Sequence, residues 1–370
     1  MNLFVGLDVS SEKLDTCFLT DDDDLSILLE KTFPNDLNGA TAIKDQIIKF
    51  TESMIFQKIV IGMESTSLYS FHPATFFQTD KELNQYELVV TVENPFKIKQ
   101  FSRIFDEDKT DRIDAFRIAD YLRLQRYSSS PLKEEKYMAL QRLTRTRYQM
   151  VCQLTEAKQH FLENLTYKCN TLSRELKNGD SPTSVFGAAM IALMTEDYSL
   201  DDFSTMSLDA LAELLQHYGK GRFKSPEKIA EAIKKAVRDS YRLGKLAQES
   251  IDIILACLVK SIQAFQKQIK ILDQAIEDLV VILPEYQCLR SIPGIGPVYA
   301  AGLLAEIGQI ERFEDQAKLA KYAGLTWKVS QSGNFQSERT PLTKTGNRYF
   351  RYYLIEATNS VRRHLPEFKA

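Results

Sequence analysis

Two short apolar segments, each with an acidic residue at its end, constrain the fold of this chain more than any other feature. Residues 3–10 contain Asp8 and residues 59–65 contain Glu64. Apolar runs of this length, rich in Val, Ile, Leu and Phe, are typical of buried β-strands. A carboxylate at the end of such a strand is costly to bury unless it is paired or binds a metal ion. The N-terminal region is therefore predicted to be a sheet with acids at its strand ends.

A second pair of acids, Asp111 and Asp114, lies three residues apart in a predicted helix. This spacing puts both carboxylates on one helix face, with Cβ atoms about 5–6 Å apart. Together with Asp8 and Glu64 they offer four oxygen ligands, which suit Mg²⁺, with Mn²⁺ as a substitute. Two such ions, about 3.5–4 Å apart, stabilise the attacking and leaving oxygens of a phosphodiester. Taken singly, each acid has an ordinary explanation as a turn cap or a solvated charge, so the prediction depends on all four.

The order of the predicted elements indicates an α/β domain over residues 1–130. Strands are predicted at 2–9, 14–20, 26–33, 58–64 and 86–92, and helices near 38–51, 68–80, 94–104 and 110–125. Three successive strands followed by alternating helices and strands is the order of a ribonuclease-H-like (RuvC-like) domain. In that fold Asp8 is on the first strand, Glu64 on the fourth and the aspartate pair on the last helix.

Residues 131–285 are predicted to be a helical coiled-coil region, because strand patterns are absent there. A heptad pattern without a break supports this, and it consists of Ile251, Leu255, Leu258, Ile262, Phe265, Ile269, Leu272, Ile276 and Leu279. Its β-branched residues fall on one seam position and leucines on the other, which favours a parallel two-stranded coiled coil. A weaker stripe between Leu140 and Leu165 could pair with it inside one chain, but we favour a homodimer or a dimer of dimers. Residues 175–235 are predicted to be a small helical insertion without an assigned function.

Residues 286–370 are predicted to form a third, mainly helical unit. It begins with Gly294 and Gly296 in a turn before a helix, a pattern similar to a helix-hairpin-helix motif. Glycine lets backbone N–H groups approach a phosphate, and the positive end of the helix dipole favours an anion. The same pattern also serves as an ordinary helix start. A neighbouring basic set favours nucleic-acid contact, and its members are Lys344, Arg348, Arg351, Arg362 and Arg363.

Charge and composition narrow the class of protein. Residues 1–80 carry 13 acids and 5 bases, a net charge of −8, whereas residues 316–370 carry 10 bases and 3 acids, a net charge of +7. An acidic N-terminal region and a basic C-terminal region are consistent with metal binding by the first and phosphate binding by the second. The five cysteines show no disulfide or zinc spacing. No apolar run is long enough for a membrane span, so we expect a cytoplasmic protein without membrane contact.

Several motifs resemble the insertion-sequence one-ten (IS110) family of transposases. The N-terminal ones are Gly6-Leu7-Asp8-Val9-Ser10, Gly62-Met63-Glu64, Asn94-Pro95 and Lys109-Thr110-Asp111-Arg112-Ile113-Asp114-Ala115. The C-terminal ones are Pro293-Gly294-Ile295-Gly296, residues 319–326, Ser330-Gln331-Ser332-Gly333 and residues 343–348. Because both ends match in order around a helical middle, the resemblance covers essentially the whole chain. One departure is Trp327, where proline is common in the family.

The resemblance implies a DNA recombinase that is guided by a structured non-coding RNA and acts on donor and target DNA. It implies that Asp8, Glu64, Asp111 and Asp114 are the catalytic metal ligands and that Ser332 is the nucleophile, with Ser330 as the alternative. Other functions stay open at this point. These are a RuvC-like metal-dependent nuclease without strand transfer, an inactive DNA-binding coiled-coil protein, and a sugar kinase of the actin-like class, for which a second Gly-rich phosphate loop is missing from the sequence.

Overall fold

The protein divides by contacts into two compact units, residues 1–134 with 309–315 and residues 135–308 with 316–370. The structure is a computed structural model that describes residues 1–22, 26–65, 68–103, 111–125, 127, 133–195, 198–327, 331–332, 335–336 and 340–368. Of residues 111, 112, 331, 332, 335 and 336 it describes the backbone alone. The predicted boundary near 130 lies close to the division between the units, and the predicted boundary between 285 and 286 lies inside the second unit.

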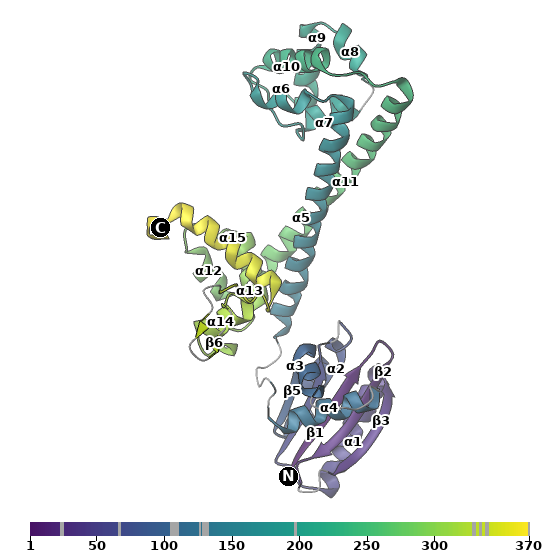
Figure 1. Cartoon of the computed structure of the whole chain (residues 1–370), viewed down its shortest axis with the longest axis vertical. Coiled ribbons are helices and arrows are strands. Elements are labelled where there is room, and N and C mark those ends of the chain that lie inside the picture. Colours follow the sequence, from purple (N-terminus) through teal and green to yellow (C-terminus); the bar gives the residue numbers. More distant parts are fainter. Residues whose placement is uncertain are drawn as a thin grey trace. The chain divides into compact units, whose positions relative to one another are not determined.

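A mixed five-stranded sheet forms the centre of the first unit (Figure 1). Its strands are β1 (Asn2–Val9), β2 (Lys13–Thr20), β3 (Ile27–Pro34), β4 (Lys58–Glu64) and β5 (Leu88–Glu93), in the order β3-β2-β1-β4-β5. β1, β2 and β3 are antiparallel neighbours, whereas β1, β4 and β5 run parallel. The five strands and the α/β class predicted from the sequence are confirmed.

Helices cover both faces of this sheet because its inner strands are apolar on both sides. α1 (Leu37–Ser53) and α2 (Phe71–Thr79) pack on the face that carries Leu3, Val5 and Leu7. α3 (Pro95–Ser102) and α4 (Asp111–Arg123) pack on the face that carries Phe4. The short helix η1 (Leu83–Gln85) precedes β5. These four α-helices are the four that the sequence pattern predicts.

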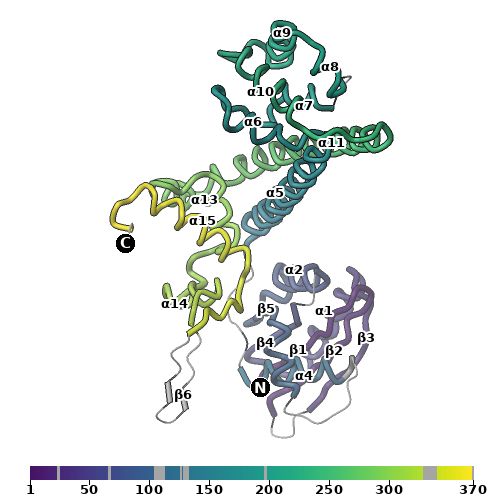
Figure 2. Tube along the Cα trace, turned by 45° about the horizontal axis from the view of Figure 1, so that its top comes forward, coloured from purple at the N-terminus to yellow at the C-terminus, as the bar shows by residue number. Residues whose placement is uncertain are grey.

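Two long helices form the frame of the second unit. α5 (Glu135–Lys168) and α11 (Lys245–Val280) pack along each other, as Figures 1 and 2 both show. They are antiparallel, because the start of α5 shares a core with the end of α11 and the end of α5 shares one with the middle of α11. The seam residues Leu255, Ile262, Ile269 and Ile276 are buried within this single chain. Intrachain pairing therefore covers these four heptad positions, whereas the other five are half-buried, and a dimer remains a prediction.

A cluster of five short helices joins the two long ones, which explains why the long helices run antiparallel. They are α6 (Leu172–Asn178), α7 (Ala188–Thr195), α8 (Leu200–Thr205), α9 (Leu208–Gly219) and α10 (Pro226–Asp239). Their apolar residues share one core with α5 and α11. Glu175 of α6 accepts hydrogen bonds from Lys235 and Arg174, which lower the pKa of its carboxyl. The predicted helical insertion is thus a packed cap on the long pair.

The C-terminal helices pack on the opposite end of α5 and α11. They are α12 (Pro284–Arg290), α13 (Pro297–Ile307), α14 (Gln316–Ala323) and α15 (Arg348–His364), followed by the short helix η3 (Pro366–Phe368). Between α14 and α15 lie the two-residue strands β6 (Gln331–Ser332) and β7 (Phe335–Gln336). The short helix η2 (Ile310–Arg312) belongs to the first unit. None of the described helices is both long and apolar enough to cross a membrane.

Candidate active site

The ends of four neighbouring strands carry acids in one row. In the antiparallel pair of β1 and β2, Asp8 stands opposite Asp15, and in the parallel pair of β4 and β5, Glu64 stands opposite Glu93. The β1–β4 ladder is in register up to Leu7 and Met63, so Asp8 and Glu64 follow at neighbouring positions. Residues in one row of a sheet point to the same face, with strands about 4.8 Å apart. The structure therefore brings the two predicted strand acids together.

This row lies on the sheet face that α4 covers. Two residues before the row, Gly6 faces α4 so closely that a Cβ atom would lie 2.3 Å from the carbonyl oxygen of Ala115 and 2.4 Å from the backbone nitrogen of Ala119. Asp114 directly precedes Ala115, so the helix brings this acid to the face on which Asp8 and Glu64 lie. Asp8, Glu64 and Asp114 are each half-buried and each has an interaction partner. α4 begins at Asp111, whose side chain lies outside the described residues.

Two acids of the row were missed by the sequence analysis, and both have neutral or cationic partners in the protein. The carboxylate of Glu93 is 2% exposed, accepts a hydrogen bond from Thr91 Oγ1 at 2.9 Å and pairs with Lys97 Nζ at 3.1 Å. Asp15 accepts a hydrogen bond from the hydroxyl of Thr32. Glu93 ends an apolar strand just as Glu64 does, and this shared pattern was the available signal. In the strand order β2-β1-β4-β5, Asp8 and Glu64 are the central members of the row.

The donor chemistry of this site fits a hard divalent cation, because carboxylate oxygens are the ligands that Mg²⁺ prefers. Within the described ranges, however, no three His, Cys, Asp or Glu side chains meet closely enough to hold a metal ion. Asp111 is the predicted ligand whose side chain lies outside the described residues. A metal site at these acids thus remains a prediction that depends on Asp111.

The predicted nucleophile lies on a hairpin in the second unit. Ser332 is on β6 and pairs with Phe335 on β7, while its side chain, Ser330 and Gly333 lie outside the described residues. Two segments of the chain flank this hairpin and form a stem; they are residues 324–327 and 342–346. Backbone hydrogen bonds from Thr343 to Thr326 at 2.7 Å and from Lys344 to Gly324 at 3.1 Å hold the stem.

The predicted nucleic-acid residues are found around this stem and the start of α13. Lys344 is exposed in the stem with a φ of 50°, and Arg348 is exposed at the start of α15, where its guanidinium stacks on the ring of Tyr349. Arg351 instead donates to backbone carbonyls, to Ala323 at 2.8 Å and to Lys344 at 3.3 Å. Its first role is therefore to hold the base of the stem, and DNA or RNA contact by any of the three remains a prediction.

The two glycines before α13 differ in their surroundings. Gly294 has a φ of +98°, and a Cβ atom there would lie 2.8 Å from the backbone of Val361 in α15. Positive φ and close helix packing both require glycine at this position. Gly296 is the N-cap residue of α13, and a Cβ atom there would meet open space. The open backbone at Gly296 makes it the better candidate of the two, and phosphate contact at either glycine remains a prediction.

Comparisons with known proteins match both ends of the chain. A family model described as Transposase, of the DEDD type of IS110, matches residues 5–169, and one described as Transposase IS116/IS110/IS902 family matches residues 286–370. The described acids of the row and α4 lie in the first match, and the hairpin lies in the second.

Curated relatives are similar over shorter stretches. The chain is 25% identical over 230 residues to an insertion element IS116 uncharacterized 44.8 kDa protein of Streptomyces clavuligerus, covering 61% of this chain and 55% of that protein. It is 35% identical over 100 residues to an insertion element IS110 uncharacterized 43.6 kDa protein of Streptomyces coelicolor, covering 27% and 24%. It is 25% identical over 174 residues to the transposase for insertion sequence element IS1111A of Coxiella burnetii, covering 44% and 43%. The matches thus span about half or less of these relatives' lengths.

Proposed function

Because this chain belongs to the IS110 family of transposases, we propose that it cleaves and rejoins DNA strands through a covalent link to Ser332. The observation that carries the proposal is the meeting of Asp8 and Glu64 at neighbouring strand ends, on the face where α4 brings Asp114. Two acids at buried strand ends, with a third on the helix that covers them, favour phosphodiester chemistry over an ordinary turn cap. The hairpin with Ser332 supports strand transfer over simple hydrolysis, since a nuclease needs no such nucleophile.

In the proposed reaction, Ser332 Oγ attacks the phosphorus of a DNA strand. A phosphorus–Oγ bond forms while the phosphorus–oxygen bond to one strand end breaks, and that end departs as a hydroxyl with the proton that serine gives up. A strand-end hydroxyl then attacks the phosphoserine, rejoins DNA and returns the proton to Ser332. The phosphodiester energy is kept in the covalent link, so the exchange needs no ATP.

The acids Asp8, Glu64, Asp111 and Asp114 would hold Mg²⁺, with Mn²⁺ as a substitute. Such ions supply positive charge that stabilises the charge developing on phosphate oxygens. None of the four histidines lies between residues 324 and 347, so a Ser-His pair within the hairpin has no support. The proposed reaction requires Ser332 to reach the acids of its own chain or of a second copy.

We further infer that DNA and a guide RNA bind through the basic residues of the C-terminal region, with base pairing by the RNA selecting donor and target. Exposed Lys344 and Arg348 support phosphate binding without base preference. A homodimer or dimer of dimers would bring donor and target together.

The test is a Mg²⁺-dependent strand-transfer assay on labelled DNA, with the RNA transcribed from the sequence that flanks the gene. The expected result is a protein–DNA adduct on denaturing gels that is absent from Ser332→Ala and from Asp8→Asn. A matched control is Asp21→Asn, because Asp21 is an exposed acid whose carboxylate accepts from Asn2 at the opposite end of β1. Cleavage without any adduct in the wild type would favour the nuclease, and no cleavage at all would favour the inactive binding protein.

A further inference from the structure

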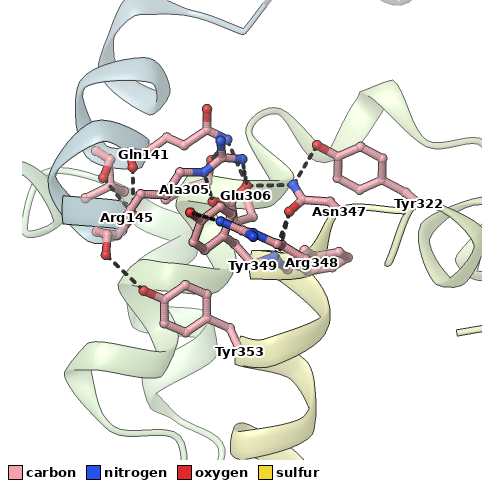
Figure 3. Close-up of polar contacts among 12 residues, drawn as sticks. Gln141, Arg145, Ala305, Glu306, Tyr322, Asn347, Arg348, Tyr349 and Tyr353 are labelled. Carbon is pink, nitrogen blue, oxygen red and sulfur yellow. Dashed lines mark hydrogen bonds and ion pairs between the residues drawn. The ribbon is translucent and has the colours of Figure 1, made fainter. Parts of the chain in front are cut away.

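A buried carboxylate in the second unit accepts hydrogen bonds from two residues of α5 and from the residue before α15. Glu306, near the end of α13, has no exposed surface. Its Oε1 accepts from Arg145 Nε at 2.7 Å, and its Oε2 accepts from Arg145 Nη2 and from Gln141 Nε2, each at 2.8 Å (Figure 3). Asn347 Nδ2 donates to the same Oε2 at 2.6 Å. The fully buried charge is thus satisfied by a two-point arginine pair and two amides.

The cation of this network is fixed as firmly as the anion. Burial of Arg145 acts to lower its pKa, but the hydrogen bonds and charge of Glu306 outweigh burial and raise the pKa above its ordinary value. The guanidinium also stacks on the ring of Tyr349, 4.5 Å from the ring centre. A planar guanidinium held by two bonds and a stacking contact admits little rotation. Glu306 is therefore held in a fixed orientation relative to α5.

Asn347 connects this carboxylate to the base of the hairpin stem. Its Nδ2 also donates to Tyr322 Oη at 3.0 Å, and its backbone N–H donates to the carbonyl of Tyr322 at 2.8 Å. Its Oδ1 accepts from the backbone N–H groups of Tyr349 and Phe350 at 3.0 and 3.1 Å, which caps α15. One side chain thus ties α13, α14 and α15 together, and through Glu306 it is tied to α5.

The stem packs closely against α14 where it joins Asn347. Gly346, the residue before Asn347, lies so close to α14 that a Cβ atom would be 2.4 Å from the carbonyl oxygen of Tyr322. Thr343 and Lys344 then pair with the chain that leaves α14, and Trp327 forms a β-bridge with Leu342. Ser332 follows Trp327 by five residues. The direction of the stem is therefore set by Asn347 and the end of α14.

We propose that Glu306 is a positioning residue for strand transfer, which fixes through Asn347 the direction in which the stem presents Ser332. This inference rests on the proposed role of Ser332. A nucleophile has to be held within about 0.5 Å of its productive position, and an error of about 1 Å reduces rate about 100-fold. Apolar packing alone would hold α13 against α15, whereas the network adds bonds of defined direction at the root of the stem.

The test compares two tyrosine-to-phenylalanine variants and a charge swap. Tyr322→Phe removes the hydroxyl that accepts from Asn347, whereas Tyr353→Phe removes a hydroxyl that donates to the carbonyl of Thr144 at 3.2 Å and does not touch Asn347. Asn347→Asp keeps a good helix cap but puts a second carboxylate against Glu306. The double change Glu306→Gln with Asn347→Asp again leaves one carboxylate and one amide at this contact.

The first readout is the single-turnover rate of adduct formation at saturating DNA and RNA. We expect about a 100-fold loss in Asn347→Asp and a loss of a few fold in Tyr322→Phe, with affinities for DNA and RNA unchanged. The double variant should form the adduct at least about ten times faster than Asn347→Asp, because the effects of substitutions at two contacting residues are not additive. Tyr353→Phe should react at the wild-type rate.

The second readout is hydrogen exchange of the Thr343 and Lys344 amides in the protein without nucleic acid. We expect exchange about tenfold faster in Asn347→Asp, faster to a lesser degree in Tyr322→Phe, and unchanged in Tyr353→Phe. Unchanged exchange in both network variants, or faster exchange with an unchanged adduct rate, overturns the positioning role. If the wild type forms no adduct that depends on Ser332, the proposed function fails first, and that result is known before any network variant is made.

Discussion

The close packing of Gly6 against α4 leads to a sharp prediction about the acid site. In Gly6→Ala the new methyl carbon would lie 2.3 Å from the Ala115 carbonyl oxygen and 2.4 Å from the Ala119 nitrogen. Ordinary carbon contacts are about 3.5 Å, so α4 has to rise by about 1 Å. Both atoms are helix backbone and no side-chain rotation relieves the clash. We expect a stability loss of about 1–3 kcal/mol, which is typical of overpacking.

The same displacement should also reduce activity. α4 carries Asp114, so a rise of the helix moves this acid away from Asp8 and Glu64. A displacement of about 1 Å in a catalytic constellation costs about 100-fold in rate. Calorimetry of the whole chain measures the first effect, and adduct formation with DNA and RNA measures the second.

Gly62→Ala is the matched control, because Gly62 pairs with Gly6 in the sheet and faces the same helix. There the new methyl carbon would lie 2.6 and 2.7 Å from the side-chain methyls of Leu122, which can rotate away. We expect Gly62→Ala to retain most of its activity. If Gly6→Ala is as stable and as active as Gly62→Ala, then backbone contact of α4 does not set the site and the reasoning is refuted.

Further predictions test other parts of the protein. Asp114→Asn should abolish cleavage, whereas its circular dichroism spectrum and RNA binding should stay as in the wild type. EDTA should likewise abolish cleavage by the wild-type protein. Cleavage by Asp114→Asn at the normal rate in Mg²⁺ contradicts the metal role. Ser330→Ala should still form the DNA adduct that Ser332→Ala lacks, and the reverse pattern on a denaturing gel would exchange the two assignments. Ile262→Asp should destabilise the second unit by about 3–5 kcal/mol in urea unfolding, because Ile262 is only 1% exposed and the new charge would be buried. Sedimentation of the folded wild type then decides separately whether copies associate. Glu175→Gln should lower the melting temperature at neutral pH. The pKa of the Glu175 carboxyl is lowered in the folded state, so its ionised form stabilises the fold at pH values above the ordinary pKa of 4.5. This difference should vanish as the pH falls through the lower pKa of the folded state, and a constant difference would contradict it.

The strands and helices of the first unit could be predicted because local patterns determine them. The two mainly apolar segments of eight and seven residues become β1 and β4, and Asp36 and Asn94 cap the helices that follow β3 and β5. Asp8 and Glu64 were found because each interrupts an apolar strand. Glu93 was missed, although its position is equivalent, because the predicted strand ended one residue before it.

The heptad pattern shows how a local rule leaves the partner undecided. The positions of Leu255, Ile262 and Ile269 predict a buried helix seam but not which helix covers it. The five short helices connect the end of α5 to the start of α11 and reverse the direction of the chain. α11 therefore packs against α5 of the same chain, and the pair is antiparallel. A dimer seam and an intrachain seam have the same apolar spacing, and only the tertiary structure distinguishes them.

The sequence by itself determined the order of the elements, the two strand-end acids and the motifs of the transposase family, because these depend on residues close together in the chain. Only the tertiary structure decided that Asp8 and Glu64 occupy neighbouring positions on the face under α4, since strand register depends on pairing between distant segments. It also decided that Glu306, a lone acid in an apolar helix, meets Arg145 and Asn347. The sequence separations are 161 and 41 residues, and no local pattern specifies contacts over such distances.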